Sequence, residues 1–479
     1  MSEYHEREVL NAGKLGTYRV HSLFTRITSE GNMQPEIGEP FPGAVALHAH
    51  EYTHYLHNLS TLAGLDALLA CFWLVTPFVR GTDDRGWFTA PVGIEKDENL
   101  SIAFSIMKSA RGSVEGIPND GLFKWPEINE WCFGTVLSSS VSLSHSTEGD
   151  IGKIGVKSIS ITAKHNRGEP LELVLIPGLD FISEGIAYEV EREQRRVPAV
   201  SDQLLDSQTP SYPYLAYRPL IEHLIEYKTT VQERILIGNL ALLTTAPSYA
   251  FFEICAAIKR DRDRGDGATK DLDKIGSDIY EAFVKHVTNS KFSYVGQLKE
   301  VLAGSSDHIQ GLEIYCKLIE KGLRLRVETP MMEQLFTQAR LSPDEFRNVT
   351  LKLLERLVCQ ETVDGESTIE WVVPLNSIIA ELPDEEIQKL SVLQTSIHFL
   401  QQHFTKDGGL GSTVNLKESA CPFAGACQTQ KEYGYPADCE SKPWNVSVAD
   451  GKQVCWYEAG RLSLRLDRRY QEVPASPAS

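Results

Sequence analysis

The chain has 479 residues, of which 42% are hydrophobic and 23% are charged, a composition typical of a soluble globular protein with a sizeable core. Its formal net charge of −18 argues against nonspecific nucleic-acid binding, which depends on Lys and Arg neutralising phosphates. The chain opens on the polar, acidic stretch MSEYHERE in place of an apolar export signal. We therefore expect a cytoplasmic protein whose nine Cys are mostly reduced thiols.

Residues 16–28 (GTYRVHSLFTRIT) are rich in β-branched and aromatic side chains with partial alternation, which predicts a strand. A strand at the edge of a cleft can pair with an extended peptide. We expect this one to precede the helix that carries the most informative motif of the chain and to border its cleft.

That motif is HExxH, within residues 48–57 (HAHEYTHYLH). On a helix, His50 and His54 project from the same face, so both imidazoles can reach one metal ion at Zn–N distances of about 2.0–2.1 Å. Glu51 can hold and deprotonate a metal-activated water without being a ligand. We expect His57 to be a hydrogen-bonded histidine rather than a fourth ligand. Leucines recurring beyond the motif predict one long, largely buried helix.

The most apolar run of the chain follows directly. Residues 59–79 are about long enough to span a bilayer, but they contain Asp66 and continue the metal-site helix. We therefore predict a buried core helix and no association with a membrane.

The next part of the chain is mixed and then turns strand-like. Residues 86–150 contain three Trp and several Gly and Ser, and we predict an inserted, loop-rich segment that caps the cleft. Residues 157–163 and 171–176 are two strand-like runs around the polar turn at 165–170. They predict a β-hairpin that leads into a helix beginning near residue 183.

A tetrahedral metal site with an open position needs a third protein ligand, and residues 183–191 (SEGIAYEVE) supply the best candidate. HEYTH at 50–54 and EGIAYEVE at 184–191 together resemble the gluzincin metallopeptidases, in whose aminopeptidase branch the second helix reads like NEGxAxxxE. The resemblance implies that Glu184 is the third ligand and that the small Gly185 and Ala187 let this helix pack closely on the first. An ordinary amphipathic acidic helix is the alternative interpretation of these residues.

The resemblance is at the level of the clan. Residues 55–183 intervene between the second His and the Glu, far more than in the aminopeptidase branch, and no GxMEN-like segment is present. Aminopeptidase activity in particular is therefore not implied. The gluzincin mechanism usually needs a Tyr or His that donates to the developing oxyanion. The Tyr-rich segment 212–218, with Tyr214, and His223 beyond it offer candidates, although Tyr in such a segment can equally serve in packing.

Four of the nine Cys lie close together near the C-terminus. They are spaced x5, x11 and x15 in a Gly- and Pro-rich stretch that cannot build much of a core without a cross-link. In a reducing compartment, four thiolates would bind a structural Zn²⁺ or an Fe–S cluster. Unrelated thiols or two disulfides are the alternatives. The predicted ligands are Cys421, Cys427, Cys439 and Cys455.

These features predict an α+β protein with four parts. They are a zincin-like catalytic domain at residues 1–260, with a small β-sheet, a long active-site helix and the insertion at 86–150; a helical domain at 268–405; a Cys-rich module at 406–470; and a disordered tail at 471–479.

The predicted function is that of a zinc-dependent metallopeptidase acting on protein or peptide substrates. His50, His54 and Glu184 would bind Zn²⁺, and Glu51 would be the general base. Two alternatives remain open. The same two-His, one-carboxylate set also describes non-haem iron oxidative enzymes, and the fold could be a non-catalytic scaffold that binds a protein partner.

Overall fold

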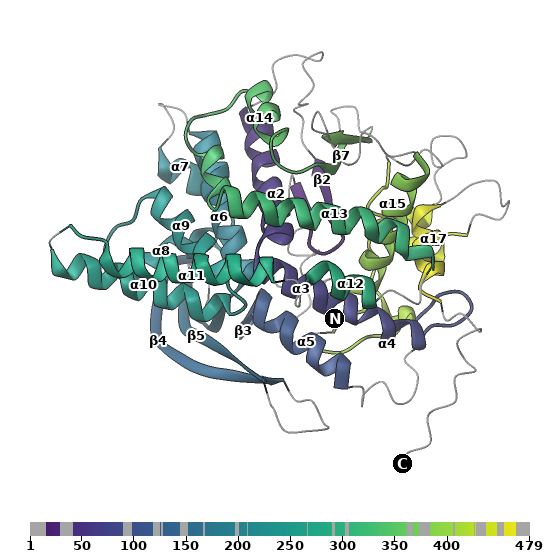
Figure 1. Cartoon of the computed structure of the whole chain (residues 1–479), viewed down its shortest axis with the longest axis horizontal. Coiled ribbons are helices and arrows are strands. Elements are labelled where there is room, and N and C mark those ends of the chain that lie inside the picture. The colour runs from purple at the N-terminus through teal and green to yellow at the C-terminus, as the bar shows by residue number, and fades with distance from the viewer. Residues whose placement is uncertain are drawn as a thin grey trace.

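The computed structural model describes most of the chain. The described residues are 16–28, 42–89, 98–117, 125, 128–143, 152–165, 168–196, 201–207, 209–265, 267–289, 293–301, 306–361, 367–372, 384–405, 408–425, 427, 437–447 and 455–465. The tail predicted at 471–479 lies outside them. Helices predominate and two four-stranded sheets accompany them (Figure 1), so the α+β class is confirmed.

The first sheet joins strands from residues 16–28 with strands from residues 356–372. Its order is β1-β2-β7-β8, and β2 pairs in parallel with β7, with Phe24 opposite Leu357. The other two pairings are antiparallel. The predicted helical domain at 268–405 therefore also contains β7 and β8, which complete the sheet of the N-terminal strands. The four strands are β1 (Gly16–Arg19), β2 (Phe24–Thr28), β7 (Arg356–Glu361) and β8 (Ser367–Val372).

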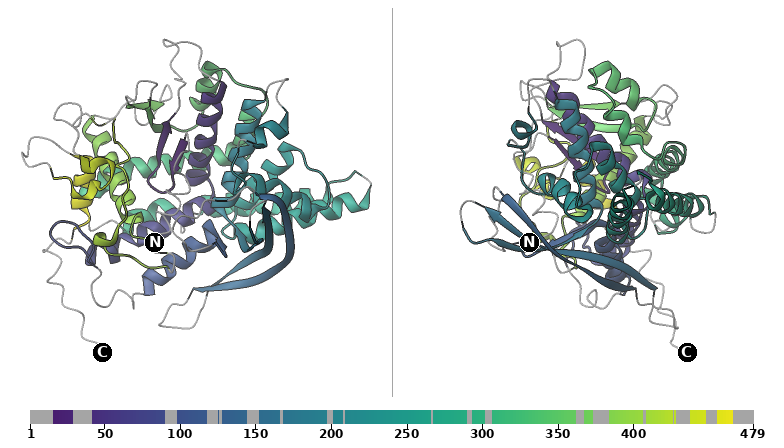
Figure 2. Two further views of the ribbon diagram at one scale, coloured as in Figure 1. Left: turned by 180° about the vertical axis from the view of Figure 1, so that it is seen from behind. Right: turned by 90° about the vertical axis from the view of Figure 1, so that its left-hand side faces the viewer.

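The second sheet is antiparallel throughout, with the order β3-β6-β5-β4. The hairpin predicted between 157 and 176 is confirmed as β5 and β6. The prediction that residues 86–150 are rich in loops is wrong, because that segment supplies helix α5 and two strands of this sheet. Figure 2 shows β4 and β5 as long curved arms that extend from the helical body. The elements are α5 (Glu98–Arg111), β3 (Gly112–Glu115), β4 (Ile128–Leu143), β5 (Gly152–His165) and β6 (Leu171–Pro177).

Two central helices carry the predicted metal-binding residues. Helix α2 (Pro42–Ser60) contains the HExxH motif and packs along α6 (Leu179–Arg195). The predicted single long helix is wrong, because the chain breaks at Thr61. There the backbone is extended, and the threonine side chain accepts a hydrogen bond from the N–H of Gly64, capping α3 (Leu62–Trp73).

The apolar segment after the motif helix lies in the core. By length and composition Leu62–Arg80 could cross a membrane, but 78% of its most apolar window is buried inside the structure. It forms α3 and α4 (Val75–Arg80). The mean hydropathy of this segment therefore reflects burial against other helices, as predicted for a core helix.

The remaining helices surround α2, α3 and α6 (Figure 1). Buried side chains from the three predicted divisions before the tail, including Phe423 and Tyr457 near the C-terminus, share one large hydrophobic core. The helices and helical turns are α7 (Asp202–Ser207), α8 (Tyr214–Ile225), α9 (Val231–Leu242), α10 (Pro247–Arg264), α11 (Lys270–Thr288), α12 (Tyr294–Val301), α13 (Ser306–Glu328), η4 (Met332–Phe336), α14 (Pro343–Thr350), α15 (Asp384–Gln401), η5 (Thr413–Asn415), η6 (Ala437–Glu440), η7 (Pro443–Asn445) and α17 (Trp456–Ser463).

Gly185 allows the close approach of the ring of Tyr217 on α8. A Cβ added at Gly185 would lie 2.2 Å from that ring, and one added at Gly238 of α9 would lie 2.4 Å from the Tyr217 hydroxyl. The hydroxyl also donates to the carbonyl of Arg234 at 2.8 Å. Tyr217 is therefore held between two glycines, and α6, α8 and α9 approach one another there.

Gly185→Ala should destabilise the fold although alanine is the better helix former. Overpacking a core costs about 1–3 kcal/mol, which outweighs the gain of about 1 kcal/mol from replacing a helical Gly. Gly276→Ala in α11 is the matched control, since its added Cβ would meet nothing closer than 3.7 Å, and it should be neutral or stabilising. Urea unfolding of both variants gives the comparison. Equal effects would contradict the close contact at Gly185.

Candidate metal centre

The three predicted ligands of the HExxH site come together. The Nε2 atoms of His50 and His54 lie 3.2 Å apart, and Oε2 of Glu184 lies 3.4 Å from the first and 3.3 Å from the second. Among the described residues, no other set of three or more His, Cys, Asp or Glu side chains has its ligand atoms within 4.8 Å of one another.

These separations suit a tetrahedral ion. Four ligands at bond lengths of about 2.0–2.1 Å stand about 3.3–3.4 Å from one another. The three atoms of His50, His54 and Glu184 are already at that spacing, as three corners of such a tetrahedron. The residues present therefore fit Zn²⁺ with one position left for a small ligand. They reach this arrangement because two of them lie four residues apart on α2 and the third faces them from α6.

The second nitrogen of His50 faces a carboxylate. Its Nδ1 lies 2.8 Å from Oε2 of Glu191, and Arg195 lies 2.6 Å from the other oxygen of that carboxylate. Burial lowers the pKa of His50, but the contacts with Glu184 and Glu191 outweigh it and raise the pKa to about 10. The surplus of carboxylates in a buried site makes positive charge favourable there, whether a proton or a metal ion supplies it.

The second nitrogen of His54 leads into a buried hydrogen-bonded chain. Its Nδ1 lies 2.7 Å from the hydroxyl of Ser183, which lies 2.8 Å from Nδ1 of His57. On its other side, Nε2 of His57 lies 3.2 Å from Oε1 of Glu333. Arg326 donates to both oxygens of Glu333, at 2.6 and 2.9 Å. The expectation that His57 is a hydrogen-bonded histidine is confirmed.

The hydrogen-bond directions along this chain agree with one another. If Nδ1 of His54 carries a proton, it donates to Ser183, and the serine hydroxyl donates onward to Nδ1 of His57. The remaining proton of His57 then lies on Nε2 and points at the Glu333 carboxylate. Burial lowers the pKa of His57, so its imidazole is neutral, as this chain requires. His54 is left with its lone pair on Nε2, the atom that faces Glu184.

The anion at the end of the chain is stable because of its partners. Burial alone would raise the pKa of Glu333, but Arg326 and His57 hold it well below its usual range. Asn239 also donates to Oε2 of Glu333 at 2.6 Å. No sequence signal pointed to Glu333 or Arg326, because a 3-10 turn and the end of α13 bring them to α2 from far along the chain.

Glu51, the predicted general base, is buried beside the ligand group and not within it. Its carboxylate lies against β1, since a Cβ on Gly16 would stand 2.6 Å from Glu51 Oε1. Its charge contributes to raising the pKa values of His50 and Tyr214. On the same strand, Tyr18 stacks on His54 with ring centroids 6.3 Å apart. The predicted strand therefore does border the site.

Of the two predicted oxyanion donors, the structure brings one to the site. Tyr214 is buried, its ring lies edge-on to His50 at 5.7 Å, and its hydroxyl is hydrogen-bonded to Glu184. His223 is exposed nine residues further along α8, about 13 Å along the helix axis, and its ring packs on Phe133 of β4. The assignment of His223 as a site residue is therefore wrong.

The structure does not bring the four predicted C-terminal ligands as close together as the three residues at His50. None of the nine Cys is in a disulfide. Cys421 and Cys439 are buried, and the backbone N–H of Cys421 donates to the carbonyl of Cys439 at 2.8 Å. The sulfurs are more widely spaced than the ligand atoms at His50, since they do not form a described group within 4.8 Å.

No protein-family model, no curated protein and no solved structure matches the chain. The chemistry assigned to the site therefore depends on its own geometry and on the two short motifs.

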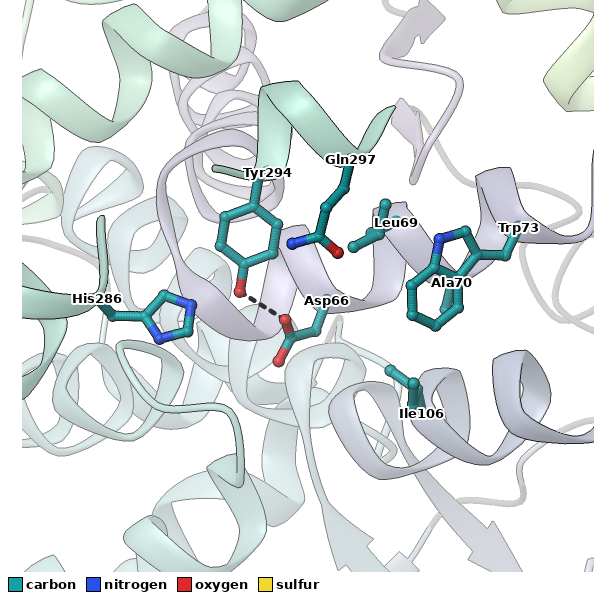
Figure 3. A pocket seen from close by; sticks show the side chains of 8 residues that line it. All are labelled: Asp66, Leu69, Ala70, Trp73, Ile106, His286, Tyr294 and Gln297. Carbon is teal, nitrogen blue, oxygen red and sulfur yellow. Dashed lines mark hydrogen bonds between the residues drawn. The ribbon is translucent and has the colours of Figure 1, made fainter. Parts of the chain in front are cut away.

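A cavity of about 150 Å³ lies apart from the His50 group and the four cysteines, between α3, α5, α11 and α12 (Figure 3). Its polar end holds Asp66, which accepts a hydrogen bond from the Tyr294 hydroxyl at 2.5 Å. Burial raises the pKa of Asp66 to about 7, and the hydrogen bond offsets only part of this. The lining side chains are Asp66, Leu69, Ala70, Trp73, Ile106, His286, Tyr294 and Gln297.

The raised pKa of Asp66 predicts a pH-dependent stability. The folded carboxyl keeps its proton up to about pH 7, whereas an ordinary Asp loses it near 3.8. The protonated Asp66 carboxyl therefore contributes its full stabilisation of the fold below pH 3.8. This stabilisation is lost as pH rises through about 7, where the folded carboxyl ionises. Relative to Asp66→Asn, whose amide does not titrate, the wild type should lose up to a few kcal/mol between about pH 4 and pH 8. Urea unfolding of both proteins across this range measures the difference, and a difference independent of pH would refute the assignment.

Proposed function

We propose that the chain is a zinc-dependent metallopeptidase of gluzincin type, with a zincin-like catalytic domain. The observation that carries the proposal is the triangle of His50 Nε2, His54 Nε2 and Glu184 Oε2, with sides of 3.2–3.4 Å. These residues would hold Zn²⁺, which would acidify a water molecule and polarise a substrate carbonyl. The order of the motifs along the chain, HExxH and then EGxAxxxE, supports the same assignment.

The chain's own residues supply the proton transfers. Glu51 takes the proton of the attacking water and passes it to the leaving amine. Its position supports this role, because it is buried between β1 and the ligand group. Tyr214 would donate to the developing oxyanion. Burial raises its pKa well above the usual range, so its hydroxyl keeps the proton that this role needs.

The strand beside Glu51 supports a peptide as the substrate. β1 is the outer strand of the described part of its sheet, and an extended peptide can add to a sheet edge by backbone hydrogen bonds. Gly16 has no side chain where the strand passes the Glu51 carboxylate. A peptide paired along β1 would therefore pass the general base and the ligand group.

Replacing the general base should abolish turnover and leave metal binding intact. Glu51→Gln keeps the size of the side chain and the three ligands, so metal content and fold should match the wild type. Cleavage of a peptide library should fall by about 10²–10⁴-fold. Metal analysis of the purified proteins accompanies the assay. A Glu51→Gln protein as active as wild type would exclude this mechanism, and stoichiometric iron with oxygen consumption would favour the oxidative alternative.

The hydrogen-bonded chain behind His54 predicts a second effect, on affinity. Ser183→Ala removes the group that holds Nδ1 of both His54 and His57. Loss of such a partner typically lowers metal affinity by about 10–100-fold. Ser207→Ala, at an exposed position on α7, is the control and should bind as the wild type does. Competition with a chromophoric chelator measures both affinities. Unchanged affinity in Ser183→Ala would show that the serine does not orient His54.

A further inference from the structure

The four C-terminal cysteines come from separate points of the last part of the chain and lie on segments that pack against one another, although no three of their sulfurs lie within 4.8 Å of one another. The backbone bond from Cys421 to Cys439 is extended by a second one, from Ser419 N to Ser441 O at 2.7 Å. Two segments therefore run side by side there. Cys427 closes a turn by donating its N–H to the carbonyl of Phe423 at 3.1 Å.

The fourth cysteine is brought to this turn by aromatic packing. Cys455 is the N-cap of α17, where its sulfur accepts from the N–H of Glu458 at 3.5 Å. The next residue, Trp456, packs edge-on against Phe423 with ring centroids 4.8 Å apart. The start of α17 therefore lies against the turn that carries Cys421 and Cys427.

Backbone contacts and aromatic packing bring the four thiols to one region of the fold. Cys421 is hydrogen-bonded through its backbone to Cys439, Cys427 closes the turn on Phe423, and Trp456 after Cys455 packs on the same Phe423. Thiolates gathered in one region repel each other unless a cation joins them, and a metal centre that displaces the thiol protons provides that cation.

We propose that Cys421, Cys427, Cys439 and Cys455 are the four thiolate ligands of one metal centre, separate from the His50 group. The centre is either a single Zn²⁺ or an iron–sulfur cluster, since both are held by four cysteine thiolates. With four protein ligands it has no open position, so its role is structural.

The location of the group shows what such a centre would support. Arg26 of β2 donates to the carbonyl of Ala424 at 2.9 Å and to that of Pro422 at 3.3 Å. The ring of Phe423 also packs edge-on against Phe24 of the same strand, at 4.8 Å. The turn between the first two cysteines therefore braces β2, and β2 carries β1, the strand beside Glu51. A metal centre there would stabilise β2 and, through it, β1, the strand that lies beside Glu51.

The test compares metal content in variants of the full-length chain, purified without oxygen. Cys427→Ser should lose the metal of this centre and keep the one at His50, and His50→Ala should do the reverse. Cys132→Ser is the matched control, since this partly buried thiol lies on β4, and it should keep both. Zinc alone identifies a Zn²⁺ site, whereas iron with acid-labile sulfide and visible absorption identifies a cluster.

A second measurement uses the wild-type protein and does not depend on the folding of a variant. Cys427 and Cys455 are partly exposed, so as metal ligands they should react slowly with iodoacetamide and rapidly after chelation or acid removal of the metal. Metal content unchanged in Cys427→Ser, alkylation unaffected by metal removal, or two disulfides among the four cysteines in the native protein would overturn the proposal. None of these outcomes depends on whether the His50 group is catalytic.

Discussion

The contact between α2 and α6 is the interaction on which the rest of the site depends. It places the Glu184 carboxylate 3.3–3.4 Å from two imidazoles that a single helix presents together. α2 is held in this position by polar contacts at buried points. The Tyr52 hydroxyl both donates to the carbonyl and accepts from the N–H of Leu354 at 2.9 Å, and Arg356 lies 2.9 Å from Nδ1 of His48. Leu354 lies just before β7 and Arg356 is its first residue, so these contacts attach α2 to the sheet.

The face of α6 that meets α2 carries more than a candidate ligand. Ser183 and Glu191 contact the Nδ1 atoms of His54 and His50, respectively, so the helix that carries the third candidate ligand also contacts the other two candidates. These contacts explain why buried polar side chains are tolerated in the centre of the core. At this contact Ser183, Glu191 and His57 have charged or hydrogen-bonding partners, and the chain of partners behind His54 ends on the ion pair of Glu333 with Arg326, both fully buried.

The sequence predicted those features that depend on neighbours along the chain. The i, i+4 histidines, the β5–β6 hairpin and the helix carrying Glu184 were all recognisable from local spacing. What it did not predict depends on distant partners. The parallel pairing of β2 with β7 joins residues 24 and 357, and no local pattern reports such a pairing. Apolar residues recur beyond His57 on both sides of Thr61, so the sequence did not indicate that one helix ends and another begins there. The side chain of Thr61 caps the start of α3. The imidazole of His223 could in principle donate a hydrogen bond to an oxyanion, but in the structure its ring packs on Phe133 of β4. The sequence did not reveal that contact.

The wide separation of the ligand residues in sequence costs the site little. The entropy of closing a loop grows only slowly with its length, by about 0.6 kcal/mol per doubling, so the long stretch between His54 and Glu184 is a modest penalty. What fixes three ligand atoms at matched distances is their attachment to packed helices, which hold side chains more firmly than loops do. A search for a fixed spacing between the motifs would therefore overlook this arrangement, because the constraint is the geometry of two helices in contact and not the number of residues that joins them.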